Sequence, residues 1–398
     1  MANTLNLGTD GNWATKEDSL LAYNSENGNF KPLPFDFTRA SSATVVNKDG
    51  LIETVGGGEP RIDFSNDAKG ALLLEPSRSN LITYSEDFSQ SGWQKQSAGV
   101  ASAPIVTSNY AISPDGTLNA DRVVFDINGG TTSSDFSQIA DAITNSIGDV
   151  TNSIWIKSNT TSNYNISFVD PDANYTSIVV TTEWRRFDVT STTSSTASAL
   201  RLRLRGSEAT SDSADVSVWG AQVEQGSYAT SYIPTQGSAV TRVADACNNG
   251  GNAQVINSTE GVLYAEINYQ NIQPNWTGFG LTDGNNPANR IVFATQLNTK
   301  NFKIYFQSGG TVRWNPNFVL NQINQYYKIA ISYKANDLSL WINGVKVASD
   351  NTVSIMPIGL DSLGFFGYSN LEPTFGKTKD VRVYTTALSD SELQALTK

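Results

Sequence analysis

Short runs of alternating apolar and polar residues, separated by clusters of Gly, Asn, Asp, Ser and Thr, recur along most of this chain. Alternation with a period of two puts apolar side chains on one face of an extended strand, so each run is typical of a half-buried β-strand. Residues 338–347 show this clearly, because Asn343-Gly344 divides the run and supplies the two positive φ values of a type I′ turn. Strand and helix patterns do not alternate, which argues against a parallel α/β sheet. We therefore expect an all-β chain.

Further runs of the same kind predict strands at residues 153–157, 178–181, 186–189, 200–205, 216–219, 262–267, 302–306 and 327–333. One short helix is expected near the C-terminus. There Ser389 and Glu392 have the spacing of a capping box, and Leu393 and Leu396 follow on one helix face. Residues 15–23 are compatible with one or two helical turns.

Composition excludes several classes of function. The 398 residues contain no His and one Cys, so the chain has no Ser-His-Asp or Cys-His pair and no usual zinc ligand set. With 27 Lys and Arg against 38 Asp and Glu, the net charge is −11, which argues against nucleic-acid binding. The first ten residues lack the pattern of a secretory signal, and no apolar stretch is long enough to span a bilayer. We expect synthesis in a cytoplasm and no membrane insertion.

Two breaks in the strand pattern suggest domain boundaries. A segment rich in Gly and Pro gives way to longer strand patterns near Leu81, and a Pro-Thr-Gln-Gly stretch interrupts them again at residues 234–237. The sequence therefore predicts three parts, at residues 1–80, 81–235 and 236–398.

Each part resembles a known kind of module. The text FDFTRASSATVVNKDGLIE, with PRIDFS and LLLEPSRSNLITYSEDFS after it, resembles a module of bacteriophage tail and fibre proteins; these are residues 35–53, 60–65 and 72–89. The central part resembles the carbohydrate-binding-module-like jelly roll of phage appendages at residues 153–158, 181–190 and 218–235. The third part resembles a laminin-G or concanavalin-like sandwich in LSLWINGVKVAS and KDVRVYTTALSDSELQAL, at residues 338–349 and 379–396.

These resemblances imply tandem antiparallel β-sandwiches, a jelly roll plus a laminin-G-like domain, behind a small N-terminal virion-attachment module. They imply a bacteriophage virion structural protein, a tail or head fibre or appendage, that adheres to host-surface glycan. The implied partners are other virion proteins, host-surface polysaccharide and two further copies of the chain in a homotrimer. The implied location is the virion, assembled in the host cytoplasm.

Sugar binding needs flat aromatic faces together with amide or carboxylate groups. The candidate residues in the third part are Trp276, Trp314, Asn285 and Asn286, which we expect in loops at the end of the sandwich. The alternative for any single Trp is a place in the core, where most large aromatic side chains lie.

Arg203 is a candidate of another kind. It is the middle arginine of an alternating run, Leu200 to Arg205, in which Leu faces one side of a strand and Arg the other. Planar guanidinium groups in a row suit the carboxylate, sulfate or phosphate groups of an anionic glycan. The alternative is a solvated or subunit-facing sheet surface.

Two other functions remain open. One is a purely structural decoration or connector protein without ligand. The other is a carboxylate-based polysaccharide depolymerase, because a glycosidase needs two carboxylates and no His. No local motif marks such a pair, so we expect no enzyme. Calcium is the single cofactor that the resemblance allows, with Asp283 and Asp361 as candidate ligands.

Overall fold

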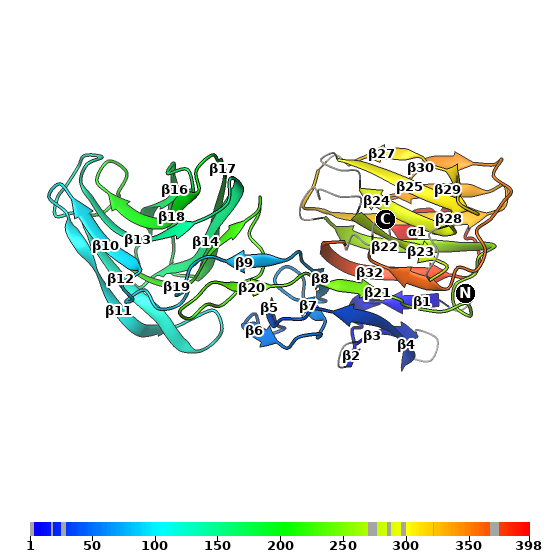
Figure 1. Cartoon of the computed structure of the whole chain (residues 1–398), viewed down its shortest axis with the longest axis horizontal. Helices are drawn as coiled ribbons and strands as arrows, with labels where there is room; N and C mark the ends of the chain where they lie inside the picture. The colour runs from blue at the N-terminus through cyan, green and yellow to red at the C-terminus, as the bar shows by residue number, and fades with distance from the viewer. Residues whose placement is uncertain are drawn as a thin grey trace. The chain divides into compact units, whose positions relative to one another are not determined.

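The computed structural model describes residues 4–16, 19–24, 29–269, 277–284, 288–295, 300–320, 322–366 and 374–398. The chain forms two compact units. Unit 1 combines Met1–Gly50, Val55–Pro76 and Val243–Lys398. Unit 2 consists of Leu51–Thr54 and Ser77–Arg242. The predicted all-β fold is confirmed, since antiparallel sheets make up most of both units (Figure 1).

Unit 2 is a sandwich of two five-stranded antiparallel sheets. In spatial order, the first sheet contains β10 (Trp93–Ala98), β13 (Phe136–Thr144), β18 (Ala197–Arg205), β15 (Tyr164–Val169) and β16 (Tyr175–Val180). The second contains β11 (Ser102–Ile112), β12 (Leu118–Asp126), β19 (Ser213–Gln225), β14 (Gly148–Ser158) and β17 (Arg185–Thr193). A separate pair is formed by β9 (Arg78–Asn80) and β20 (Val240–Arg242).

The core of unit 2 draws apolar side chains from both five-stranded sheets. Leu202 of β18 and Val216 of β19 are fully buried in it, and Trp93 is 1% exposed. In β18 the three leucines are buried and the three arginines between them are half-buried, as the alternation predicts. One face of the first sheet therefore covers the core, and its other face carries the arginines.

Unit 1 contains two antiparallel sheets that share one apolar core. The larger sheet runs through β21 (Ala246–Asn248), β4 (Asn29–Thr38), β3 (Ser19–Asn24), β1 (Thr4–Leu7), β32 (Gly376–Tyr384), β22 (Glu260–Asn268), β28 (Tyr326–Lys334), β29 (Leu338–Ile342) and β30 (Val345–Asp350). Three short strands join it off this path: β2 (Thr15–Lys16), β7 (Arg61–Asp63) and β8 (Ala71–Leu74). The smaller sheet contains β26 (Thr311–Trp314), β25 (Asn301–Ser308), β24 (Arg290–Thr295), β23 (Thr277–Thr282) and β31 (Ser362–Gly364), and β27 (Asn317–Val319) pairs with β25.

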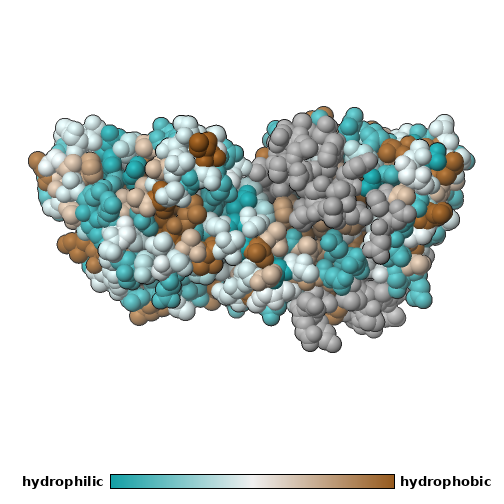
Figure 2. Space-filling model, in the orientation of Figure 1, coloured by the Kyte–Doolittle hydropathy of each residue, from teal (hydrophilic) through white to brown (hydrophobic). Residues whose placement is uncertain are grey.

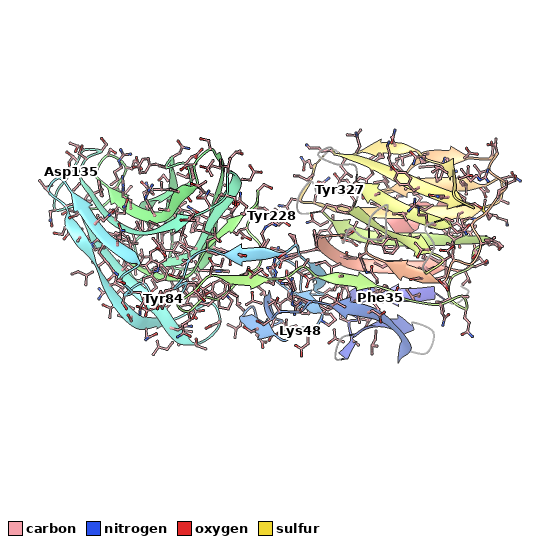
Figure 3. The ribbon with its side chains drawn as sticks, viewed as in Figure 1. Phe35, Lys48, Tyr84, Asp135, Tyr228 and Tyr327 are labelled. Atoms are coloured by element: carbon pink, nitrogen blue, oxygen red, sulfur yellow. The ribbon has the colours of Figure 1, made fainter. Side chains whose placement is uncertain are left out.

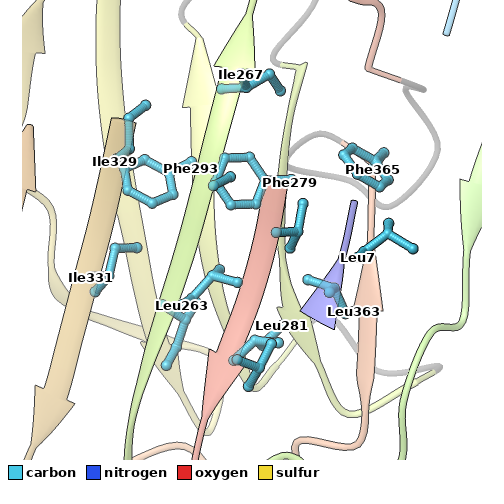
Figure 4. Close-up of a cluster of buried hydrophobic side chains, with 14 of the residues drawn as sticks. Leu7, Leu263, Ile267, Phe279, Leu281, Phe293, Ile329, Ile331, Leu363 and Phe365 are labelled. Atoms are coloured by element: carbon cyan, nitrogen blue, oxygen red, sulfur yellow. The ribbon is translucent and has the colours of Figure 1, made fainter. Parts of the chain in front are cut away.

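Both sheets of unit 1 contribute buried side chains to the cluster drawn in Figure 4. Leu263 and Ile329 come from the larger sheet, and Phe279 and Phe293 come from the smaller one. The rings of Phe279 and Phe293 stack with their centroids 5.0 Å apart. This shared core makes the two sheets one sandwich.

The N-terminal strands belong to unit 1 because the last strand of the chain pairs with them. Antiparallel pairing joins β32 to both β1 and β8. The division of the chain into residues 1–80, 81–235 and 236–398 differs from this arrangement, in which most of the first part and most of the third lie in unit 1. Two short strands complete the inventory, β5 (Ala43–Val46) and β6 (Ile52–Val55).

Local predictions at the C-terminus are confirmed. Asn343 and Gly344 have φ values of 48° and 81° in the turn between β29 and β30, as a type I′ hairpin requires. Helix α1 (Asp390–Thr397) begins with a capping box between Ser389 and Glu392. The suggestion of helical turns at residues 15–23 is wrong where the structure describes them, because they form β2 and β3 beside the 3-10 turn η1 (Thr9–Gly11).

The described surface mixes hydrophobic residues, singly or in small groups, with hydrophilic ones (Figure 2). None of the helices in the described residues is both long enough and apolar enough to span a bilayer. Cys247 is fully buried, in agreement with its interpretation as a packed side chain, and burial raises the pKa of its thiol.

Candidate functional site

Of the four sugar-binding candidates predicted in the third part of the chain, the structure describes one, Trp314. Trp276, Asn285 and Asn286 lie outside the described residues. Trp314 is 8% exposed and belongs to the unit 1 core, opposite Phe306 of β25. The expectation that Trp314 lies in a binding loop needs correction, because its ring packs against the core and offers no open face to a sugar.

Asp283 and Asp361, the candidate calcium ligands, lie near each other beside the end of β23. The Asp361 amide donates to the Thr282 carbonyl oxygen at 2.9 Å, and Asp283 Oδ2 accepts from Asn289 Nδ2 at 3.1 Å. Among the described residues, no group of three or more Asp, Glu, Cys or His side chains is arranged to hold a metal ion. Calcium binding at this place stays a proposal.

Arg203 lies in a polar cluster on the outer surface of the first sheet of unit 2. In the strand pairing, Arg203 is opposite Gln138 of β13 and Ser167 of β15, and Arg201 is opposite Ala140 and Val169. These positions share the sheet face that points away from the leucine core. We call this surface the arginine face, and its members are Gln96, Phe136, Gln138, Tyr175, Arg201, Arg203 and Arg205.

Among the described residues, the hydrogen-bond partners of the Arg203 guanidinium are both neutral. Its Nε donates to Gln138 Oε1 at 2.7 Å, and its Nη1 donates to the Tyr175 hydroxyl at 2.6 Å. The guanidinium carbon lies 3.9 Å from the centroid of the Phe136 ring and 5.0 Å from that of Tyr175. Gln138 Nε2 in turn donates to Gln96 Oε1 at 2.7 Å. These contacts fix the orientation of Arg203 before any ligand arrives.

Charges on the arginine face are incompletely balanced. Arg205 pairs with Glu208 at 2.9 Å, whereas Arg201 and Arg203 form no ion pair with any carboxylate in the described part of the chain. Burial lowers the pKa of the Arg203 guanidinium, and the positive charges of Arg205 and Arg201 act in the same direction. A guanidinium nevertheless stays protonated in proteins. The face therefore presents two uncompensated positive charges in a chain whose net charge is −11.

Sequence reasoning found the arginines but missed their partners. Gln138 lies 65 residues before Arg203, and Tyr175 lies 28 residues before it. They meet Arg203 only because β13, β18, β15 and β16 are neighbours in one sheet. Their own stretches carry no local motif that marks them, so the order of strands in the sheet would have been needed to find them.

Unit 1 holds a separate pocket of about 660 Å³, lined by β22 and β32, by the residues that follow β1 and precede β8, and by the end of α1. Three cations on its lining already have carboxylate partners: Lys69 with Asp10 at 3.4 Å, Lys379 with Asp67 at 2.7 Å and Arg382 with Asp380 at 2.6 Å. A charged ligand would compete with these pairs. The pocket is therefore a weaker candidate than the arginine face.

Comparisons with known proteins concern the fold. Residues 247–394 match the family model described as the Concanavalin A-like lectin/glucanases superfamily. Comparison of the sequence with curated proteins found no match.

Several solved structures resemble parts of the chain at low identity. Domain 4 of AbnA, a GH43 extracellular arabinanase from Geobacillus stearothermophilus, in complex with arabinotriose, is 16% identical with a TM-score of 0.32, covering 44% of this chain and 83% of that one. The CBM40 of the Ruminococcus gnavus IT-sialidase, bound to α2,3 sialyllactose, is 15% identical with a TM-score of 0.31, covering 38% and 94%. A heptameric SAP-like pentraxin from Limulus polyphemus is 11% identical with a TM-score of 0.28, covering 35% and 70%.

The family match coincides with the C-terminal part of unit 1, which is an antiparallel sandwich in the structure. The predicted laminin-G or concanavalin-like fold of the third part is therefore confirmed. Residues 247–394 form a domain similar to the concanavalin A-like lectins and glucanases.

Proposed function

We propose that this chain is a glycan-binding protein and that the arginine face of unit 2 binds an anionic saccharide. The observation that carries the proposal is the environment of Arg203: Gln138 and Tyr175 orient its guanidinium, and no carboxylate in the described residues pairs with it. The lectin-like domain in residues 247–394 supports glycan binding in general. The arginine face adds the class of glycan.

The chemistry follows from the spacing of the arginines. Arg201 and Arg203 are two residues apart on one strand, so their Cα atoms are about 6.8 Å apart along it. Each guanidinium offers paired N–H donors that fit the two oxygens of a carboxylate or sulfate. Tyr175 is 41% exposed, and its ring borders both Arg203 and Arg205. The arginines would bind acidic groups of a polysaccharide, and the exposed part of Tyr175 would contact one of its sugar rings.

The test is calorimetric titration of the whole chain with short oligomers of galacturonic acid and with neutral galactose oligomers of equal length. We expect binding of the acidic oligomer, which weakens with salt, and little binding of the neutral one. Arg201→Ala and Arg203→Ala should each reduce the affinity. Arg313→Ala removes an exposed positive charge from β26 and serves as the matched control. Equal affinity for both oligomers would contradict the proposal.

We further propose that the glycan binder is a subunit of a bacteriophage tail or head fibre, located on the virion and trimeric. The support is the resemblance of residues 35–53 and 72–89 to a phage fibre module. The domain comparisons bear on the lectin-like fold and not on a virion. Mass determination of the purified oligomer tests the trimer, and binding to host cells before and after periodate oxidation tests adhesion.

Assays on the same purified protein distinguish the two alternative functions, a depolymerase and a structural connector. Release of reducing ends from a bound polysaccharide would identify a depolymerase and contradict our expectation of binding without hydrolysis. Absence of binding to any acidic glycan or susceptible cell would favour a structural connector. We also propose Asp283 and Asp361 as ligands of a calcium ion. Titration of the unchanged chain and of Asp283→Asn with CaCl₂ tests this, and we expect the variant to bind calcium more weakly.

A further inference from the structure

Unit 2 contains a pocket of about 650 Å³ whose lining includes no residue of the arginine face. This volume lies within the range typical of small-molecule sites. Tyr84, Glu86 and Asp87 line it from the segment between β9 and β10; Figure 3 labels Tyr84. Asn119 and Asp121 line it from β12, and Thr235 lines it from the segment that follows β19. We call it the Tyr84 pocket.

Three carboxyl groups give the Tyr84 pocket its charge. Asp121 is 1% exposed and accepts the backbone N–H groups of Phe88 at 2.8 Å and Asn109 at 2.9 Å. Glu86 accepts from the Tyr232 hydroxyl at 2.8 Å and from Asn119 Nδ2 at 3.0 Å. None of the three carboxylates has an ion-pair partner among the described residues. Every hydrogen bond that they accept therefore comes from a neutral group.

The protonation of these groups favours a negative pocket near neutral pH. Burial raises the pKa of Asp121 to about 6, so Asp121 remains mostly ionised at pH 7. Burial also raises the pKa of Glu86, while hydrogen bonds from Tyr232 and Asn119 act in the opposite direction. Burial opposes ionisation of Asp87, but hydrogen bonds from Gln90 and Ser89 bring its pKa below the usual value. Lys95 is the cation whose charge acts on Asp87 and Asp121, at a longer range than an ion pair.

Two polar atoms beside the carboxylates lack partners. Thr235 is 7% exposed, and its hydroxyl has no hydrogen-bond partner in the described part of the chain. The side-chain oxygen of Asn119 is also buried and unpartnered there. Buried polar groups normally have partners, so groups of this kind on a pocket wall point to a ligand that supplies them. A half-buried aromatic ring, Tyr84, lies on the same wall.

We infer that the Tyr84 pocket binds a sugar residue that carries a free amino group. Its ammonium group would lie beside Glu86 and Asp87, with the buried charge of Asp121 behind them. Its hydroxyl groups would bond Thr235 and Asn119, and its ring would pack on Tyr84. A carboxylated or sulfated sugar would be repelled. A divalent cation is a poorer match, because the three carboxylates line the same pocket without converging on one point: no group of three or more acidic side chains in the described residues is arranged to hold a metal ion.

The first experiment compares short oligomers of glucosamine with N-acetylglucosamine oligomers of equal length, by calorimetric titration of the whole chain at near-neutral pH. The acetylated oligomer keeps the ring and its hydroxyl groups but lacks the positive charge. We expect the glucosamine oligomer to bind roughly tenfold or more tightly, as one desolvated charge pair suggests. Equal affinity, or no binding of either oligomer, would overturn the inference.

Variants then locate the site. Asp87→Asn and Tyr84→Ala should each weaken binding of the glucosamine oligomer severalfold, whereas Asp149→Asn, on β14, is the matched control for a lost charge in unit 2. Arg203→Ala should leave this binding unchanged, which separates the Tyr84 pocket from the arginine face. If Asp149→Asn weakens binding as much as Asp87→Asn, the attraction is general and the inference fails. The inference also fails if CaCl₂ binds the chain, Asp87→Asn abolishes that binding, and the glucosamine oligomer does not bind.

Discussion

The guanidinium of Arg61 and the carboxylate of Asp245 form an ion pair at 2.5 Å, with both side chains fully buried in unit 1. The two residues are 184 positions apart in the sequence. Asp245 also pairs with the buried Arg39 at 3.0 Å and accepts the backbone N–H of Glu75 at 2.7 Å, while Arg61 pairs with Glu75 at 2.7 Å. This cluster joins the N-terminal segment of unit 1 to the stretch that precedes β21.

Loss of Asp245 should destabilise the protein strongly. Asp245→Ala leaves two buried guanidinium groups short of a partner, and removing one member of a buried ion pair costs about 3 to 5 kcal/mol. Urea denaturation followed by tryptophan fluorescence measures the change. The control is Lys69→Ala, since Lys69 and its partner Asp10 are 64% and 77% exposed and their pair should contribute almost nothing. Equal effects of the two substitutions would show that the buried cluster is not important for stability.

Arg203→Lys should weaken binding of an acidic oligosaccharide although it keeps the charge. A lysine ammonium cannot reproduce the planar fork that contacts Gln138 and Tyr175, nor its stacking between the Phe136 and Tyr175 rings. We expect a loss of roughly tenfold in affinity by calorimetric titration. Full retention of affinity in the lysine variant would mean that charge alone, and not geometry, binds the ligand.

Stability should depend on pH through Asp121. Its pKa is raised from 3.8 to about 6 in the folded protein, so the folded state holds this proton more tightly than the unfolded chain does. The contribution of Asp121 to the free energy of unfolding is then greatest below pH 3.8, and it is lost as the pH rises towards 6. Asp121→Asn should remove this component. Urea denaturation of both proteins across that interval tests it, and parallel pH profiles would contradict the assignment.

Gly344→Ala should destabilise the hairpin between β29 and β30. Gly344 has a φ of 81°, which is unfavourable for residues with a Cβ atom, so we expect a cost of about 1 kcal/mol. Thermal unfolding measures the change. Gly92→Ala is a suitable control, because Gly92 is not among the glycines with positive φ and an added Cβ would meet its nearest neighbour, an Asp141 oxygen, at an ordinary 3.6 Å. A smaller effect at Gly344 than at Gly92 would contradict the expectation.

Features encoded by neighbouring residues could be predicted from the sequence. The alternation of Leu and Arg in β18, the Asn343-Gly344 turn and the Ser389 capping box each depend on a few adjacent positions, and all three are confirmed. The prediction of helical turns at residues 15–23 was wrong because contacts with distant strands, and not adjacent residues, determine the structure there. Pairing of β3 with both β1 and β4 outweighs a weak local tendency to form a turn of helix.

Features that depend on strand order could not be predicted. The hydrogen bond from Arg203 to Tyr175, the Tyr84 pocket and the pairing of β1 with β32 all join stretches that carry no local sign of one another. Trp314 shows that a local pattern can also mislead when strand pairing decides where a side chain lies. Its polar neighbours Arg313 and Asn315 suggested a loop, but strand pairing turns the ring into the core of unit 1.

The pairing of β32 with β1 and β8 also determines the order in which the chain can fold on the ribosome. All of the long segment Ser77–Arg242 of unit 2 emerges before β32, the strand that joins the N-terminal strands to the rest of the larger sheet, is synthesised. At the usual translation rate of about 5 to 20 residues per second, the N-terminal strands wait on the order of ten seconds or more for that partner. Unit 2 can complete its two sheets during this interval, whereas unit 1 cannot close its larger sheet until synthesis is almost finished.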